Sequence, residues 1–322
     1  MTNLKNQQVL IDTTRTGKSR FWSERKTHNL ILSQAYKSID SRKSERLSDC
    51  AGWLVFKKFD DGSKKLDKAD FCRVRLCPIC SWRRSLKIFG QMNKIMSAMK
   101  TEGQYSFIFL TLTMANCKKD QLNFQIDAMM NGWKAFMKYK DIRTAVKGWY
   151  RGLEVTHNTN SGSESYDTYH PHFHAVFAVP TWYFTHKGYL SKDEWADFWK
   201  KAMGLEYEPV VDVRKVKGDT VGAVLEATRY TVKTEDYIIA DDWDLSVDAV
   251  RVLDKALHRR RLVAFGGIMK DLHKALNLDD AIDGDLLHIQ DENLSEDNYR
   301  LVRYVFSTGY NQYITNDDRE GV

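Results

Sequence analysis

Four of the five cysteines in the chain are clustered, and their spacing predicts that separate segments meet at one metal ion. The four are Cys50, Cys72, Cys77 and Cys80. The last two have the spacing of a zinc knuckle, and the first two can complete four thiolates around a tetrahedral ion. We therefore expect structural zinc in a compact module over residues 47–81, with Cys117 left as a buried thiol. A redox-active Cys-x-x-Cys pair is the competing interpretation, but no thioredoxin-like βαβ pattern surrounds these residues.

Bulk properties favour a reducing compartment and leave the partner open. Residues 1–25 are polar and basic without an apolar signal core, and no apolar run is long enough to span a bilayer. Cysteines without a signal peptide are typical of a reducing environment, so we expect a cytoplasmic protein. The formal net charge of +6 permits a polyanionic partner such as nucleic acid but does not demand one.

An irregular alternation of strand-like and helix-like runs indicates the fold class. Strand-like runs occupy residues 105–113, 149–156, 172–179 and 209–216. Helical spacing occupies residues 82–100, 122–138 and 247–261, with further helices expected from Ser191 and Thr220. No glycine-rich phosphate loop follows any strand, which argues against a doubly wound sheet. The pattern predicts an α+β fold, in which helices flank an antiparallel sheet and a cysteine module lies N-terminal to it.

Composition shifts divide the chain into four consecutive segments. Residues 1–27 have no periodic apolar pattern and are expected to form a flexible basic arm. The zinc-binding module and a basic helix follow over residues 47–100, and the sheet domain over residues 101–245. Residues 246–322 are expected to form a helical and mixed region that is a candidate for nucleic-acid binding. Within it, residues 265–267 (Phe-Gly-Gly) are expected to mark a turn.

An alternating histidine pair predicts a second metal site. His172 and His174 are two residues apart, so a strand projects both imidazoles from the same face. Glu154 lies in the preceding strand-like run between apolar neighbours, where an unpaired carboxylate is costly. If the two runs pair as a hairpin, the three side chains form a usual ligand set for a divalent ion. Ordinary sheet-surface histidines are the alternative, and a pairing of His170 with His172 is also open.

Glu226, Tyr230 and Lys233 share one face of an expected helix. A tyrosine phenol has a pKa of about 10, so it needs assistance to act as a nucleophile. A polarised phosphate and a nearby ammonium would assist its attack, and a carboxylate one turn away could activate water for a second cleavage. By itself, this pattern is equally typical of a solvated, salt-bridged helix face.

Two basic clusters are candidates for contact with phosphates. The first surrounds the cysteines and comprises Arg73, Arg75, Arg83, Arg84 and Lys87. The second, at residues 258–261 (His-Arg-Arg-Arg), ends the helix expected over residues 247–261. A solvated basic face and a helix end that favours cations are the respective alternatives.

Together these motifs resemble the plasmid rolling-circle replication initiators of the Gram-positive type, within the HUH endonuclease superfamily. Residues 107–113 (FIFLTLT) resemble the first motif of that family, and residues 171–174 (PHFH) resemble its metal-binding second motif. Residues 226–233 (EATRYTVK) resemble the nucleophile motif of the branch that pairs one tyrosine with a glutamate. Residues 76–84 (LCPICSWRR) resemble the cysteine segment of that branch. The order and spacing agree over residues 47–280.

The resemblance implies a fold, a reaction and roles for individual residues. It implies an HUH-type sheet in which magnesium or manganese is held by His172, His174 and Glu154. It implies Tyr230 as the nucleophile, Glu226 as the base for a later hydrolysis, and Lys233 as a group that positions the phosphate or the metal. The implied reaction nicks one strand at the double-strand origin through a covalent 5′-phosphotyrosine, followed by strand transfer and hydrolytic termination.

The resemblance also implies partners, and other classes of protein remain as alternatives. The implied partners are the hairpin and single-stranded nick site of the origin, with a host helicase and polymerase; a homodimer is left open, and no membrane is involved. A mobilisation relaxase or a transposase uses the same chemistry on different DNA. A zinc-containing DNA-binding regulator without catalysis would keep the cysteines but leave the sets around Glu154 and Tyr230 unexplained. Metal dependence of DNA cleavage separates this last class from the nucleases.

Overall fold

The protein folds as two units that are each discontinuous in sequence. A computed structural model describes residues 7–14, 17–101, 105–185, 188–216, 224, 227–228, 232–289 and 299–315. The first unit comprises residues 1–83, 240–251 and 285–322, and the second comprises residues 84–239 and 252–284. Each contains one sheet whose strand pairs are all antiparallel. The α+β fold class expected from the sequence is therefore confirmed.

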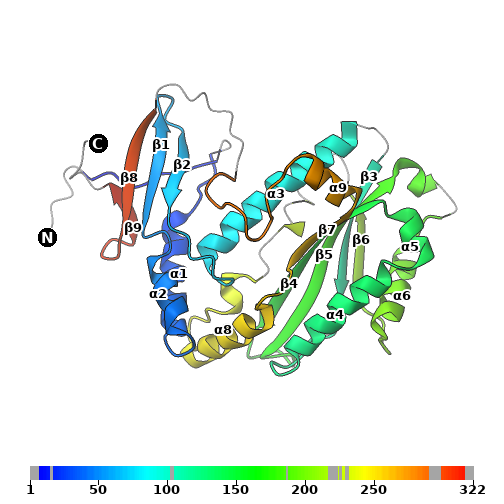
Figure 1. Ribbon diagram of the computed structural model, residues 1–322. Coiled ribbons are helices and arrows are strands. Elements are labelled where there is room, and N and C mark those ends of the chain that lie inside the picture. Colours follow the sequence, from blue (N-terminus) through cyan, green and yellow to red (C-terminus); the bar gives the residue numbers. More distant parts are fainter. Residues whose placement is uncertain are drawn as a thin grey trace. The chain divides into compact units, whose positions relative to one another are not determined.

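The sheet of the first unit has the strand order β2-β1-β8-β9 (Figure 1). Its elements are α1 (Trp22–Tyr36), α2 (Ser41–Asp49), β1 (Trp53–Phe59), β2 (Lys64–Ala69), β8 (Tyr299–Ser307) and β9 (Gln312–Thr315). Gly62 makes the turn between β1 and β2 with a φ of 83°, a conformation that favours glycine. One face of the sheet buries Phe56, whose ring packs edge-on against Trp22 of α1.

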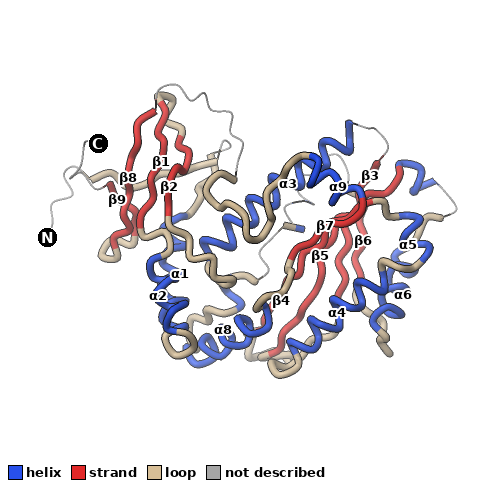
Figure 2. Tube along the Cα trace, in the orientation of Figure 1, coloured by secondary structure: helices blue, strands red, loops and turns tan. Residues whose placement is uncertain are grey.

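The sheet of the second unit has the strand order β6-β3-β5-β4-β7 (Figure 2). Its strands are β3 (Tyr105–Thr113), β4 (Gly148–Asn158), β5 (Thr168–Pro180), β6 (Val211–Lys215) and β7 (Val263–Gly267). Its helices are α4 (Leu122–Phe136), α5 (Lys140–Ala145), α6 (Lys192–Met203) and α9 (Ile268–Ala275), with the short 3-10 helices η1 (Thr181–Thr185) and η2 (Thr234–Asp236). Two of the four boundaries between the units fall inside α3 (Pro78–Thr101) and α8 (Trp243–Leu257). None of the helices within the described residues is long and apolar enough to cross a membrane.

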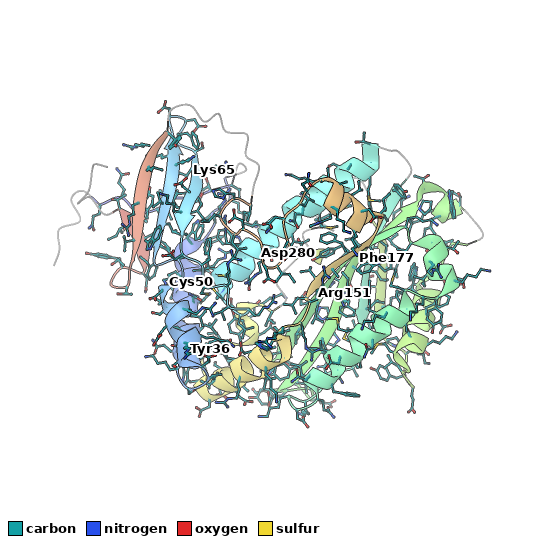
Figure 3. All side chains as sticks on the ribbon, in the orientation of Figure 1. Tyr36, Cys50, Lys65, Arg151, Phe177 and Asp280 are labelled. Atoms are coloured by element: carbon teal, nitrogen blue, oxygen red, sulfur yellow. The ribbon has the colours of Figure 1, made fainter. Side chains whose placement is uncertain are left out.

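Alternation along β5 assigns its side chains to two covered faces. Phe177 packs against Trp133 of α4 and Trp195 of α6. Val176, on the opposite face, belongs to an apolar cluster with the methionines of α3. Figure 3 labels Phe177 together with Arg151 of β4, the strand beside it. Because side chains alternate with a period of two, His172 and His174 share the face of Val176.

Several elements match the sequence expectations closely. The strand expected over residues 105–113 has those bounds in β3. The helix that begins after Ser191 has a capping box, because the Ser191 hydroxyl accepts from the Glu194 backbone while the Glu194 carboxylate accepts from the Ser191 backbone. Helix α4 occupies most of the run expected over residues 122–138. These elements are specified locally, by periodicity and capping residues.

The turn expected at residues 265–267 is wrong, because these residues belong to β7 and pair with β4. Gly266 lies opposite Trp149, and a Cβ built on Gly266 would be 2.1 Å from the Trp149 ring. The glycine is required by the close approach of an indole rather than by a turn. Sequence alone cannot separate these two uses of glycine.

The division into four consecutive segments differs from the structure, because both units are discontinuous in sequence, and two of the differences show the reason. Residues 22–27 belong to helix α1 rather than to a flexible arm, and Trp22 donates from Nε1 to Asp12 Oδ2 at 2.7 Å. The buried side of α1 includes Lys26 and Asn29, so the apolar period that marks a helix is missing. Strand β8 comes from the C-terminal segment but pairs with β1 in the first unit. Local composition does not reveal such distant pairing.

Candidate functional site

The pairing of β4 with β5 brings three predicted ligands onto one face of the second unit's sheet. Glu154 lies directly opposite His172, and Gly152 lies opposite His174. Glu154 and His172 are buried and His174 is half-buried. The hairpin on which the predicted cluster depended is therefore present.

The ligand atoms of these residues converge. Nε2 of His174 lies 3.0 Å from Oε2 of Glu154, and Nε2 of His172 lies 3.6 Å from the same oxygen. One ligand atom from each residue lies within 4.8 Å of the others. Two imidazole nitrogens and a carboxylate oxygen form a donor set that suits a divalent cation and leaves coordination positions for other ligands. The residues present therefore fit a metal ion.

Each of the two histidines is also oriented by a contact at Nδ1, the ring nitrogen that does not face Glu154. Nδ1 of His172 lies 3.1 Å from the backbone oxygen of His170, and Nδ1 of His174 lies 3.2 Å from Oγ1 of Thr111. A carbonyl oxygen only accepts, so Nδ1 of His172 donates in this contact. Such outer contacts fix the tautomer and orientation of metal-binding imidazoles.

The sequence left open that His170 pairs with His172 as a metal ligand, but in the structure His170 supports His172 instead. Its backbone carbonyl holds His172, and its ring stacks on that of His172 with centroids 5.1 Å apart. Among the described residues, the convergent cluster contains Glu154, His172 and His174 but not His170. Burial, followed by the charge of His172, lowers the pKa of His170 below its ordinary value.

The Glu154 carboxylate is held in its ionised form. Burial raises its pKa, but hydrogen bonds from His172 and His174 outweigh burial and hold the pKa well below its usual value. Lys233 adds its Nζ at 3.6 Å from Oε1 of Glu154. Of the three residues predicted to share a helix face, Lys233 is the one that the structure describes. Its backbone is extended, so the helical placement is wrong for Lys233, but its side chain contacts the predicted metal ligand.

The predicted nucleophile Tyr230 and the predicted base Glu226 lie outside the described residues, but their neighbours are placed. Val224, Ala227 and Thr228 are buried, and the Thr228 amide donates to the Val224 carbonyl at 2.9 Å. A Cβ built on Gly152 would lie 3.1 Å from the backbone oxygen of Ala227. The segment before Tyr230 therefore packs closely on β4 at the residue opposite His174.

The segment after Tyr230 is fixed to the end of β4 by contacts that the sequence analysis missed. Asp236 accepts from the backbone amide of His157 at 3.0 Å and from that of Lys233 at 2.8 Å. The His157 ring contacts the Asp236 carbonyl oxygen and Oδ1 of Asp167, each at 3.0 Å. It also stacks on Tyr169 with centroids 4.4 Å apart. His157 lies just beyond the strand-like run expected over residues 149–156, and nothing local indicates its partner nearly eighty residues away.

In the first unit, the four clustered cysteines meet as expected from their spacing. Cys50 Sγ lies 3.6 Å from Cys77 Sγ and 3.7 Å from Cys80 Sγ, and Cys72 Sγ lies 3.7 Å from Cys80 Sγ. Zinc–sulfur bonds of about 2.3 Å place tetrahedral sulfurs about 3.8 Å apart, whereas a disulfide needs about 2.05 Å. The four thiols therefore fit a tetrahedral ion, and Cys50 is labelled in Figure 3. Burial raises the pKa of the Cys77 thiol well above its ordinary value.

A buried lysine beside the cysteines was not found from the sequence. Lys26 is 2% exposed, and its Nζ donates to the backbone oxygens of Ser48 and Cys50 at 2.6 and 2.7 Å. Burial lowers its pKa, and the charge of Cys50 opposes that shift. Lys26 lies in a helix without apolar periodicity, so the sequence did not indicate that its side chain is buried.

The basic cluster around the cysteines is largely engaged within the chain. Arg83 is 5% exposed and donates to the backbone oxygens of residues 286 and 287, each at 2.8 Å. Arg84 donates to the backbone oxygen of residue 282, and Lys87 pairs with Asp279 at 2.6 Å. The structure thus differs from the expected phosphate-contacting surface at Arg83 and Lys87, because burial removes both from solvent. For Arg73, which is exposed, and Arg75, which is half-buried, phosphate contact stays a prediction.

The basic end of α8 is also partly structural. Arg260 forms an ion pair with Asp127 of α4 and donates to Asn123 at 3.2 Å. These contacts attach the residues after α8 to α4 within the second unit. They favour the interpretation of Arg260 as a packing residue over a role in DNA binding.

Comparison with known proteins gives a consistent set of relatives. A family model described as replication protein matches residues 63–314. A protein named Protein rep from Bacillus amyloliquefaciens is 40% identical over 315 residues, which cover 88% of this chain and 90% of that protein. Protein rep from Streptococcus pneumoniae serotype 2 (strain D39 / NCTC 7466) is 33% identical over 302 residues, with 91% of each chain covered.

A shorter relative matches a smaller part of the chain. A replication protein from Staphylococcus aureus is 35% identical over 222 residues, covering 66% of this chain and 92% of that protein. No solved structure matches significantly.

Proposed function

The chain belongs to the family of replication proteins, and from this premise we propose that it initiates rolling-circle replication of a plasmid by nicking one strand at the origin. The observation that carries the proposal is the convergence of His172, His174 and Glu154. Nε2 of His172 lies 3.6 Å and Nε2 of His174 lies 3.0 Å from the Glu154 carboxylate. The segments on both sides of Tyr230 pack on the same sheet. A regulator without catalysis would not need this arrangement.

The proposed chemistry is an in-line displacement at phosphorus. A divalent ion such as magnesium or manganese, when bound by the three ligands, would supply Lewis-acid polarisation of the scissile phosphate. The Tyr230 phenol oxygen loses its proton and attacks phosphorus, the bond from phosphorus to the 3′ oxygen breaks, and that oxygen takes up a proton. The products are a 3′-hydroxyl that primes a host polymerase and a 5′-phosphotyrosine that conserves the energy of the broken bond.

Two charged side chains complete the proposed site. Lys233, whose Nζ lies 3.6 Å from Oε1 of Glu154, positions the phosphate and offsets the negative charge that develops on its oxygens. Glu226 acts later, when the regenerated origin is cut again, by accepting a proton from the water that ends the cycle. One protein molecule is then used for one round of replication, with unwinding supplied by a host helicase.

The clustered cysteines have a structural part in this proposal. They hold zinc, because the sulfur separations of 3.6 and 3.7 Å fit a tetrahedral thiolate site. This site belongs to the first unit, whereas the proposed nuclease ligands belong to the second. Four thiolates fill the coordination of a tetrahedral ion, so zinc stabilises the fold and takes no part in the cleavage.

A covalent-adduct assay tests the proposal. Purified protein is mixed with a labelled supercoiled plasmid carrying its own gene and flanks, with or without added manganese, beside Tyr230→Phe. A manganese-dependent, SDS-resistant adduct that is lost in Tyr230→Phe is expected. Binding without any nick, in several metals and with an exposed origin strand, would refute nicking in favour of a regulator. An adduct that persists in Tyr230→Phe would refute the assigned nucleophile.

A further inference from the structure

The four-stranded sheet of the first unit has a solvated face that carries both rings and cations. Alternation along β1 and β8 turns Phe56 and Tyr304 toward the buried side of the sheet. The basic sheet face, on the opposite side, includes Trp53, Lys57, Phe59, Tyr299, Leu301 and Arg303, and Lys57 forms an ion pair with Asp67 of β2 at 3.9 Å. Tyr299 is 41% and Leu301 55% exposed, so no described segment covers them.

The strands of this sheet concentrate the positive charge of the chain. Their basic residues are Lys57, Lys58, Lys64, Lys65, Lys68, Arg300 and Arg303, and their one acidic residue is Asp67. The whole chain is nearly balanced, with 49 lysines and arginines against 43 acidic residues. The excess on these strands therefore equals the formal net charge of the whole chain, which is +6. A polyanion is the partner that this distribution attracts.

Aromatic rings alternate with the cations on this face. Lys57 Nζ lies 4.4 Å from the centroid of the Tyr299 ring, and the Arg303 guanidinium lies 5.2 Å from the centroid of the Trp53 ring. Phe59 and Tyr299 are neighbours, with centroids 6.0 Å apart. Nucleic-acid surfaces of this kind pair phosphates with cations and stack unpaired bases on rings.

We propose that the basic sheet face binds single-stranded DNA, with bases stacked on its rings and phosphates contacting its cations. A duplex keeps its bases stacked inside and would engage the cations alone, so the exposed rings favour an unpaired strand. The inference rests on the proposed function, because nicking beside a hairpin exposes such a strand. The face would then hold DNA that flanks the cut.

Binding of labelled single strands by the full-length protein tests this surface. Fluorescence anisotropy is measured with a short single strand of mixed sequence and no added divalent ion, for wild type, Tyr299→Ala and Arg303→Glu. We expect each variant to bind about fivefold or more weakly. Arg303→Glu should also flatten the dependence of log affinity on log salt, because fewer counterions are released. Lys37→Glu, the same charge reversal at an exposed residue beyond α1, is the matched control and should bind like wild type.

A duplex of equal length distinguishes the two forms of DNA. Tyr299→Ala should weaken binding of the single strand more than that of the duplex. Equal losses on both would overturn the assignment of an unpaired strand, and unchanged single-strand binding in both face variants would overturn the surface itself. Thermal unfolding checks each variant, and Arg303→Ala replaces Arg303→Glu if the charge reversal lowers the melting temperature.

The adduct assay separates this inference from the proposed function. Normal adduct formation at Tyr230, with single-strand binding unaffected by the face variants, refutes the surface alone. Single-strand binding that depends on Tyr299 and Arg303, in a protein that forms no adduct, supports the surface and refutes nicking. Equal weakening by Lys37→Glu would show a general charge effect and overturn the surface.

Discussion

At the scale of single residues, Thr111 offers the sharpest test of the metal cluster. Its Oγ1 lies 3.2 Å from Nδ1 of His174, whose Nε2 faces Glu154. Thr111→Val keeps the shape and removes the hydrogen bond that orients the imidazole. We expect the manganese concentration for half-maximal nicking to rise about 10- to 100-fold, with little loss of maximal rate. A titration of nicking against manganese measures both quantities.

Thr113→Val is the matched control for this change. Thr113 is on the same strand two residues away, but its hydroxyl donates to the backbone oxygen of Val210 at 2.7 Å. Its removal should leave the manganese requirement unchanged. If the two variants shift the titration equally, Thr111 does not act through His174.

Glu226 provides a second test at this scale, because its proposed role begins only after the first cut. Glu226→Ala should nick within about twofold of wild type, while hydrolytic release at termination falls about a hundredfold or more, the usual contribution of a general base. Release of protein from a preformed adduct on a regenerated origin measures the second step. Glu235→Ala, an exposed glutamate in the following segment, should be normal in both steps. Normal termination in Glu226→Ala would refute the assignment.

The sequence predicted the ligand cluster but not what supports it. His172 and His174 are detectable because a period of two needs only local information. Asp236 and Thr111 were missed because their partners come from other elements, through strand pairing and chain reversal. A hydrogen bond between distant residues leaves no trace in local spacing.

At the scale of elements, the approach of the Ala227 segment to β4 depends on a missing side chain. A Cβ at Gly152 would lie 3.1 Å from the Ala227 backbone oxygen, so the segment before Tyr230 would have to move by a few tenths of an ångström. Gly152→Ala should therefore slow nicking about tenfold or more, since small misplacements of a nucleophile are costly. The manganese requirement should change little, because the three ligands keep their positions.

A second glycine gives the control for this element. Gly162 lies in the loop between β4 and β5, where an added Cβ would be 3.5 Å from Asn160 Oδ1, an ordinary contact. Gly162→Ala should nick like wild type. If Gly152→Ala also nicks normally, the contact with Ala227 does not position the nucleophile.

Elements with their own periodicity were predicted, and those defined by distant contacts were not. Strand β3 and helix α4 follow from alternating or helical apolar spacing. Helix α1 was assigned in part to a flexible arm because Lys26 and Asn29 occupy its buried side. Strand β7 was interpreted as a turn because Gly266 faces Trp149. In both cases the deciding interaction is tertiary.

At the scale of the whole molecule, the two candidate metal sites lie in different units and differ in chemistry. Four thiolates favour zinc, whereas two imidazoles and a carboxylate accept magnesium or manganese. The chain should therefore retain tightly bound zinc through purification and need added manganese for nicking. The two requirements should respond to different substitutions.

Substitution of one ligand in each unit separates these requirements. Cys77→Ser should lose the bound zinc and lower the melting temperature, because a structural site contributes directly to folding free energy. His174→Ala should keep the zinc and the melting temperature but lose nicking at all manganese concentrations tested. Elemental analysis, thermal unfolding and the adduct assay measure the three properties.

Cys117→Ser, which removes a buried thiol outside the cluster, should keep its zinc and is the control for cysteine loss. Loss of zinc from His174→Ala, or full zinc in Cys77→Ser, would contradict the assignment of one metal to each unit.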